Sequence, residues 1–159
     1  MIPSYSLAQV FGISISEQRK IYFNHRNTLI SLLSNTLTEQ QDALTCDWNS
    51  EGAIFCNPPY SKIMPWVKKA AEQHRRQNQT IVMLLPSDTS TSWFQEAIKT
   101  SHEARFITEG RLSFISAETG KEGKAGNSKG SVLFIWRPWR KLGCRITYVQ
   151  RKELLKARR

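Results

Sequence analysis

The tetrapeptide Asn57-Pro58-Pro59-Tyr60 is the segment whose residue types best fit a chemical task. The side-chain oxygen of Asn57 and the backbone carbonyl of Pro58 are acceptors, and the prolines stiffen the backbone between them. Together they can accept hydrogen bonds from both N–H groups of an exocyclic amine. The nitrogen lone pair is then turned toward an activated methyl group. Tyr60 can stack on the base that carries the amine. The base must first be flipped out of its duplex to reach this position. Because Asn-Pro is also a common turn former, a plain turn is the competing interpretation.

An in-line displacement of this kind depends on positioning and electrostatics, so it needs no histidine or cysteine nucleophile. The three histidines lie far apart in the sequence, and Cys46, Cys56 and Cys144 show no CxxC or metal-ligand spacing. We therefore expect no metal site and no disulfide framework, and a reducing cytoplasm as the compartment. We also expect no membrane association, because there is neither a long apolar run nor a signal-peptide pattern.

The net charge is unevenly distributed along the 159 residues. The chain has 23 Lys+Arg against 13 Asp+Glu, a formal net charge of +10. Residues 1–60 carry −2 and residues 61–159 carry +12. Such an excess attracts polyanions, of which nucleic acid is the commonest, although a solvated basic surface is the simpler alternative.

Hydrophobic patterning predicts the elements that must position the tetrapeptide. Helices are expected over residues 14–34, over 62–78 and after Ser87–Ser92; strands over Gly52–Cys56, Thr80–Leu85, 103–108, 111–115, Ser131–Trp136 and Arg145–Val149. Alternation from 52 to 101 indicates β-α-β-α, hence an α/β fold with a parallel sheet and helices on both faces, a Rossmann-like three-layer αβα arrangement. Residues 103–136 are expected to form a long hairpin on the sheet edge. Ligands of such sheets bind beyond the carboxyl ends of the strands, where the tetrapeptide lies.

Several longer segments occur in the order typical of one enzyme family. They are Thr38–Leu44 (TEQQDAL), Asp47-Trp48, residues 56–70 (CNPPYSKIMPWVKKA), 82–94 (VMLLPSDTSTSWF), 110–114 (GRLSF) and 130–136 (GSVLFIW). Over residues 36–136 the chain thus resembles phage-encoded DNA N6-adenine methyltransferases of the Dam type. The resemblance implies S-adenosyl-methionine as methyl donor, adenine in double-stranded DNA as acceptor, a catalytic loop of Asn57, Pro58, Pro59 and Tyr60, and phage or prophage DNA modification in the cytoplasm of a bacterial host. An RNA or protein N-methyltransferase is a weaker reading of the tetrapeptide.

Upstream of residue 36 the chain departs from the family pattern. No strand that ends in Asp and no GxG precedes Asn57, and so the donor-binding residues are not identified. We divide the chain into an atypical helical segment (1–35), a methyltransferase-like catalytic region (36–138) and a basic C-terminal tail (139–159). An inactive DNA-binding remnant of such an enzyme is the alternative function. The sequence does not indicate the oligomeric state.

Basic residues downstream of the tetrapeptide are candidates for binding the substrate DNA. A glycine-rich loop at 120–130 could follow a phosphate backbone, or could simply be solvated. Arg111 could position a phosphate, or form a structural ion pair. Asp88 fits a turn or helix-capping role better than a substrate contact. The candidate substrate-binding residues are Arg111, Lys121, Lys124 and Lys129.

Overall fold

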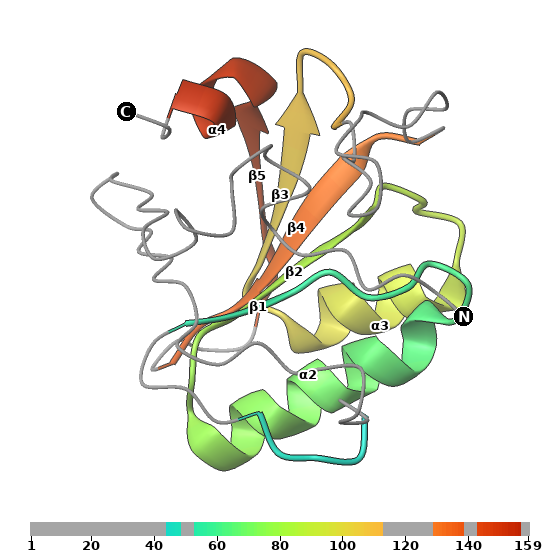
Figure 1. Cartoon of the computed structure of the whole chain (residues 1–159), viewed down its shortest axis with the longest axis vertical. Helices are drawn as coiled ribbons and strands as arrows, with labels where there is room; N and C mark the ends of the chain where they lie inside the picture. Colours follow the sequence, from blue (N-terminus) through green and yellow to red (C-terminus); the bar gives the residue numbers. More distant parts are fainter. Residues whose placement is uncertain (1–43, 49–52, 113–128, 139–142, 157–159) are drawn as a thin grey trace, which may run out of the picture.

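The computed structural model describes residues 44–48, 53–112, 129–138 and 143–156, which form one sheet and its helices (Figure 1). The elements are β1 (Ile54–Cys56), α2 (Ile63–Gln77), β2 (Ile81–Pro86), α3 (Ser92–Thr100), β3 (Glu103–Thr108), β4 (Ser131–Trp136), β5 (Arg145–Gln150) and α4 (Arg151–Lys156). Most agree with the predicted elements to within a few residues. The helix expected at 14–34 lies outside the described residues. The strand expected at 111–115 does not begin at Arg111 or Leu112, and its remainder lies outside the described residues.

The sheet is mixed, with the strand order β1-β2-β4-β3-β5. The pairs β1–β2 and β3–β5 are parallel, whereas β4 runs antiparallel to both of its neighbours. The expectation of a parallel sheet with a hairpin at its edge was therefore wrong in two respects: β4 is inserted between β2 and β3, and β5 lies beyond the hairpin. All six residues of β4 are buried, whereas β5 is largely accessible. A largely apolar strand is best covered in the interior of a sheet, and a strand with more polar residues tolerates the edge.

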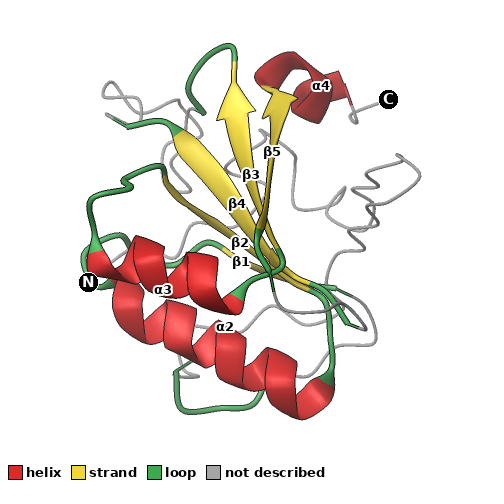
Figure 2. Ribbon diagram, turned by 180° about the vertical axis from the view of Figure 1, so that it is seen from behind, coloured by secondary structure: helices red, strands yellow, loops and turns green. Residues whose placement is uncertain are grey.

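Two helices pack side by side against one face of the sheet (Figure 2). That face is formed by alternate residues of β2 and β4, paired as Ile81 with Trp136, Met83 with Phe134 and Leu85 with Val132. On the opposite face of β2, Val82 and Leu84 are fully buried as well. Burial on both faces confirms the interpretation of the continuous apolar run at 80–85. The described part of the chain shows α2 and α3 on the same face, and not one on each face as expected.

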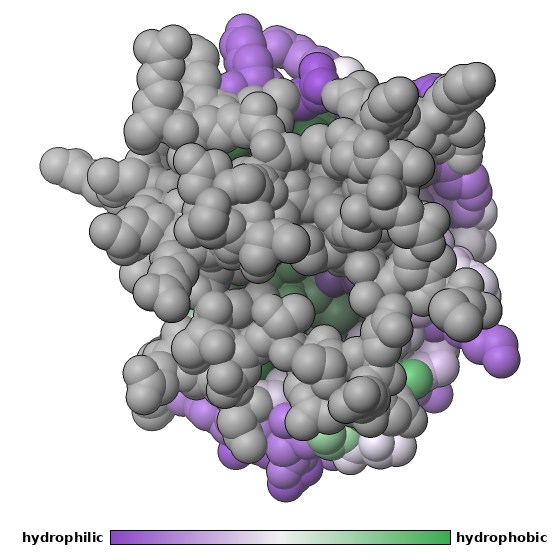
Figure 3. Space-filling view, viewed as in Figure 1, coloured by the Kyte–Doolittle hydropathy of each residue, from purple (hydrophilic) through white to green (hydrophobic). Residues whose placement is uncertain are grey.

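Helix α2 forms where the spacing of apolar residues predicts it. Ile63, Val67 and Ala70 are buried against the sheet, and Pro65 is accommodated because it lies in the first turn. The helix ends at Asn78, whose φ of 50° is left-handed and whose N–H bonds to the His74 carbonyl. In the view of Figure 3, hydrophilic residues lie along the lower rim of the molecule, over α2. The helix therefore directs an apolar side to the sheet and a polar side to solvent.

A short segment before β1 is fixed on α2 by polar contacts. Gln73 accepts from the backbone N–H of Trp48 at 2.9 Å and donates to Asp47 at 3.1 Å, while Arg76 bonds the same carboxylate at 2.8 Å. The Gln73 and Arg76 bonds hold the pKa of Asp47 below its usual value. Trp48 is buried, 6.4 Å from the ring of Trp66. The Asp47-Trp48 motif, one of the segments on which the resemblance rests, thus has a structural role in this chain.

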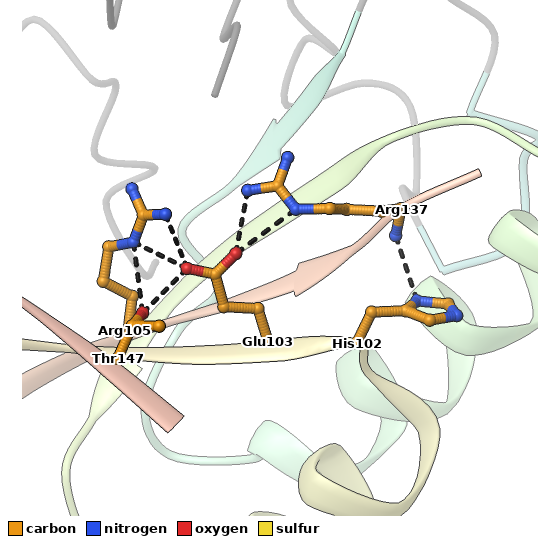
Figure 4. Close-up of polar contacts among 5 residues, drawn as sticks. All are labelled: His102, Glu103, Arg105, Arg137 and Thr147. Atoms are coloured by element: carbon orange, nitrogen blue, oxygen red, sulfur yellow. Dashed lines mark hydrogen bonds and ion pairs between the residues drawn. The ribbon is translucent and has the colours of Figure 1, made fainter. Parts of the chain in front are cut away.

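Buried charges connect the three strands β3, β4 and β5 (Figure 4). The Glu103 carboxylate, on a side chain that is only 9% exposed, bonds Arg105 at 2.8 Å, Arg137 at 2.9 Å and the Thr147 hydroxyl at 2.7 Å. Beside this network His102 Nδ1 accepts from the backbone N–H of Arg137 at 3.0 Å. Burial alone would raise the pKa of Glu103, but the bonds from Arg137, Thr147 and Arg105 outweigh it and lower the pKa. This network holds β5, which comes from the predicted basic tail, against the sheet.

Candidate functional site

Most of the predicted site residues that the structure describes lie at one edge of the sheet. Because β1, β2, β3 and β5 all run in the same direction, their carboxyl ends meet at this edge, where the antiparallel β4 begins. The tetrapeptide follows β1, the Ser87–Thr91 turn follows β2, Arg111 follows β3, and Lys129 precedes β4. This is the edge at which open α/β sheets bind their ligands.

Asn57 provides a hydrogen-bond acceptor that the described residues do not use. Its Oδ1 atom is buried, and no group in the described ranges donates to it. Leaving such an atom without a donor costs about 1–3 kcal/mol. A cost of this kind is uncommon in a native fold, and a donor from a bound ligand would recover it. The neighbouring Pro58 is buried, and with Pro59 it removes two backbone N–H groups from the corner. The corner therefore favours a ligand that donates hydrogen bonds.

Tyr60 closes the corner with an aromatic ring. It is partly buried and packs against the hydrophobic core, as the turn interpretation requires, while part of the residue stays accessible. Burial, with a smaller contribution from Cys56, raises its pKa, and so the phenol stays neutral at physiological pH. Burial also raises the pKa of Cys56 to about 12. The Cys56 thiol is therefore protonated and inert as a nucleophile, in keeping with a displacement that needs no cysteine nucleophile.

The turn after β2 is tied to the start of β4 beside the tetrapeptide. The Ser87 N–H donates to the Gly130 carbonyl at 2.8 Å. The Ser87 side chain lies so close to Gly130 that a Cβ atom on this residue would be 2.6 Å from the Ser87 hydroxyl oxygen. An alanine at residue 130 would therefore force the Ser87 hydroxyl out of its place, a steric conflict that the sequence alone does not reveal.

Asp88 belongs to the same turn and forms an ion pair with Lys129. Its carboxylate accepts from the Ser90 hydroxyl at 2.7 Å, and its carbonyl accepts from the Thr91 hydroxyl at 2.9 Å. Lys129 and Ser90 hold the pKa of Asp88 below its usual value. The turn role expected for Asp88 is confirmed, whereas the N-cap of α3 is Thr91. The ammonium of Lys129 already contacts a carboxylate, so a phosphate at this position would compete with Asp88.

Arg111 is exposed just beyond the end of β3. Glu109 and Gly110 direct the chain there through positive φ angles of 58° and 118°. No ion pair joins Arg111 to another residue of the described ranges, so the alternative of a structural ion pair gains no support. Three strand spacings of ~4.8 Å, about 14 Å in all, separate β1 from β3, so Arg111 and Asn57 follow strands that are not neighbours. The phosphate-binding role of Arg111 stays a prediction.

The other site predictions fall outside the described residues or concern absences. Lys121 and Lys124 lie outside the described residues. Within the described ranges there is no cluster of three or more His, Cys, Asp or Glu side chains that could hold a metal ion. Among the described helices, none has the length and apolarity needed to cross a bilayer.

Two arrangements were not foreseen from the sequence, one at the site and one at the opposite edge of the sheet, where β3 begins. They are the Asp88–Lys129 ion pair and the charged network of Glu103. The only sequence signal for the first was Asp88 in a turn and Lys129 before a strand, 41 residues apart. The second had none, because its members are polar residues of strands whose pairing was not predictable.

Comparison with known proteins assigns the chain to a family. The family model described as DNA N-6-adenine-methyltransferase (Dam) matches residues 20–159. A DNA N-6-adenine-methyltransferase of Haemophilus phage HP1 (strain HP1c1) is 39% identical, over 67% of this chain and 60% of that protein. A protein of the same description from Escherichia phage T1 is 44% identical, over 63% of this chain and 47% of that protein.

The chain therefore spans between about half and three fifths of the length of these relatives. No solved structure matches it. The family match is longer than the 36–136 resemblance, because it includes part of the N-terminal segment that was expected to depart from the pattern, together with the whole predicted tail. With 140 of its 159 residues matched, this chain belongs to the DNA N-6-adenine-methyltransferase (Dam) family.

Proposed function

We propose that this chain transfers a methyl group from S-adenosyl-methionine to the N6 amine of an adenine flipped out of double-stranded DNA. We propose further that it modifies phage or prophage DNA in the cytoplasm of a bacterial host. The observation that carries the proposal is the buried Asn57 Oδ1, which has no donor among the described residues and lies at the carboxyl edge of the sheet in a chain of the Dam family.

The corner is chemically matched to an amino group. Asn57 Oδ1 would accept a hydrogen bond from one N–H of the adenine amine, and the Pro58 carbonyl would accept a hydrogen bond from the other. Because Pro58 and Pro59 carry no N–H, the two residues present acceptors without a competing backbone donor. When both N–H groups donate hydrogen bonds, the nitrogen moves toward tetrahedral geometry and its lone pair is exposed. S-adenosyl-methionine supplies the activated methyl group on which that lone pair acts.

Tyr60 would form the wall on which the flipped base stacks. A neutral ring suits this role, and burial keeps its phenol un-ionised by raising its pKa. Base–aromatic stacking contributes about 1–3 kcal/mol per base. That is of the same order as the few kcal/mol that base flipping costs.

The finer description of the fold belongs to the same proposal. We propose a Rossmann-like three-layer arrangement, with an atypical segment at 1–35, a catalytic region at 36–138 and a basic tail at 139–159. Lys121, Lys124, Lys129 and Arg111 are proposed DNA contacts. The donor-binding residues are not assigned.

The test is methylation-sensitive restriction of DNA from cells that express the chain, compared with an Asn57→Ala variant. We expect protected sites with the native chain and a loss of about 10²-fold or more in methyl transfer for Asn57→Ala, as for the loss of other preorganised hydrogen bonds at reaction centres. Equal cutting of the two DNA samples would contradict the proposal and favour the inactive DNA-binding remnant. Isothermal titration with S-adenosyl-methionine completes the test, because a remnant would not bind the donor at micromolar concentration.

A further inference from the structure

Arg151 is a partly buried arginine without a carboxylate partner in the described part of the chain. It is the first residue of α4, directly after β5, and its Nε atom is buried with no hydrogen-bond acceptor among the described residues. The other partly buried arginines of the described ranges, Arg105 and Arg137, both pair with Glu103. A partly desolvated guanidinium is costly unless an anion lies beside it, and so Arg151 favours an anionic ligand.

The Arg151 side chain lies over Gly110, at the carboxyl edge of the sheet. The parallel register of β3 and β5 pairs Thr108 with Gln150, so the residues that follow the two strands leave the sheet side by side (Figure 1). A Cβ atom at residue 110 would lie 3.2 Å from Arg151 Cδ and 3.9 Å from its Nη1. Because Gly110 carries no side chain, the guanidinium can lie against the backbone there, which limits its freedom before any ligand binds.

Arg111 adds a second cation beside this position. It follows Gly110 directly, is exposed, and has no ion pair with a residue of the described ranges. The carboxylate of Glu109 is already bonded to Lys152 at 3.3 Å, so this pair neither neutralises the two arginines nor adds a free charge to them. Glu153, exposed in α4, makes no ion pair with either arginine in the described part of the chain. Two arginines with unmatched charge therefore start one residue apart around Gly110.

The strand order places these arginines on the same edge as the tetrapeptide. Along this edge lie Asn57 after β1, the Asp88–Lys129 pair between β2 and β4, Arg111 after β3 and Arg151 after β5. Three and four strand spacings of ~4.8 Å, about 14 and 19 Å, separate β1 from β3 and from β5. A duplex covers that distance in about four to six base pairs of ~3.4 Å. One duplex can therefore place a flipped base at the corner and a backbone phosphate at the arginines.

We propose that Arg151 and Arg111 form a site for backbone phosphates of the substrate DNA, at the far end of the carboxyl edge from the catalytic corner. Each guanidinium neutralises a phosphate, and the phosphate supplies the counter-charge that the described residues do not give to Arg151. These contacts fix the position of the duplex along the edge without reading its sequence. The inference rests on the proposed function, since it takes DNA as the substrate, and it adds Arg151 to the proposed DNA contacts.

The test measures the affinity of the full chain for a mixed-sequence duplex, by fluorescence anisotropy at a series of salt concentrations. Arg151→Ala and Arg111→Ala should each reduce the slope of log K against log salt by about 0.9, the value for one lost phosphate contact. Each should weaken binding about tenfold or more, as expected for the loss of a hydrogen bond between charged groups. Arg151→Lys keeps the charge but not the planar fork, so it should keep the native slope and only part of the affinity.

The matched control is Arg75→Ala, because this exposed residue lies near the end of α2, which leads to the amino end of β2. Its slope should equal that of the native chain. Thermal melting curves show whether each variant folds. If Arg151→Ala melts early, Arg111→Ala decides the test, because that side chain is exposed and its removal leaves the packing on Gly110 intact. Native affinity and slope in the folded alanine variants would overturn the inference.

Inorganic phosphate carries the same chemical group as the DNA backbone, and a second measurement separates the two sources. The melting temperature of the native chain and of Arg151→Ala is compared in phosphate and in chloride at equal ionic strength. We expect no stabilisation that depends on Arg151, since one phosphate ion lacks the other contacts of a duplex. Stabilisation by phosphate that Arg151→Ala abolishes, combined with native DNA slopes in the variants, would overturn the assignment to DNA.

The outcomes separate this inference from the proposed function. Asn57→Ala should keep the native salt slope, because that residue acts on the flipped base. In an active chain, Arg151→Ala should raise the KM for the duplex about tenfold and leave kcat unchanged, since it binds a phosphate remote from the reacting atoms. Reduced slopes in a chain without methyl transfer would support the phosphate site and contradict the enzymatic proposal. Methyl transfer combined with native slopes in both alanine variants would support the enzyme and overturn the site.

Discussion

The substitution Glu103→Gln tests whether a single buried carboxylate holds the edge of the sheet in place. The Glu103 carboxylate lies 2.5 Å from Arg105 and 2.9 Å from Arg137, whose side chains are 20% and 14% exposed. Removing one partner of a buried ion pair typically costs about 3–5 kcal/mol, because the remaining charge is left uncompensated. The amide that replaces the carboxylate would keep its shape and one acceptor but not its charge. We therefore expect a loss near the lower bound, about 3 kcal/mol in the free energy of unfolding.

The stability that Glu103 contributes is expected to depend on pH. The folded-state pKa of Glu103 lies below its ordinary value near 4.5. A carboxyl of this kind contributes stability that is present above its unfolded-state pKa and is lost as the pH falls through the folded-state pKa. The difference in the free energy of unfolding between the native chain and Glu103→Gln should therefore stay constant from about pH 6 to 8. It should decrease progressively below about pH 4.5.

The assay is urea denaturation at a series of pH values, with Glu72→Gln as the control. Glu72 forms an exposed pair with Arg76 at 3.6 Å, and pairs of this kind contribute less than about 1 kcal/mol. The reasoning would be refuted if Glu103→Gln were within about 1 kcal/mol of the native chain at about pH 7, or if the gap failed to narrow in acid. Because Thr147 also bonds Glu103, hydrogen exchange of the β5 amides should accelerate in this variant but not in the control.

Three further predictions concern the residues around the tetrapeptide. Gly130→Ala should lower both the melting temperature and methyl transfer, because its Cβ would lie 2.6 Å from the Ser87 hydroxyl oxygen. Adding Ser87→Gly in the same chain should restore both. A double variant without this restoration would contradict the steric argument. Asp88→Asn should tighten DNA binding at low salt by removing the carboxylate that pairs with Lys129, whereas Lys129→Ala should reduce the salt slope by about 0.9; weaker binding by Asp88→Asn would rule out a phosphate contact at Lys129. Cys56, with its pKa raised to about 12, should react with iodoacetamide at about pH 8 much more slowly in the folded chain than in urea, and equal rates would show that the thiol is not desolvated.

Local patterns were sufficient to predict most elements. Apolar spacing located α2, a continuous buried run located β2, and Pro58 and Pro59 mark the end of β1. These features depend on residues within one turn or one strand of each other, where side-chain periodicity and the missing proline N–H act directly. The acceptors of Asn57-Pro58 could be read in the same way, because two adjacent residues supply both.

Only the tertiary structure decided how the strands are ordered and which charges meet. An amphipathic or buried strand fits several positions in a sheet, and so the insertion of β4 between β2 and β3 follows from the sum of long-range contacts. The pairing of Asp88 with Lys129 and of Glu103 with Arg137 joins residues 41 and 34 positions apart, which no local pattern specifies. The amino-acid sequence by itself determined an acceptor-rich corner at the end of a buried strand. Packing between distant segments decides that Asn57 Oδ1 is buried without a donor from the described residues. It also places this corner on one edge with Arg111 and the Asp88–Lys129 pair.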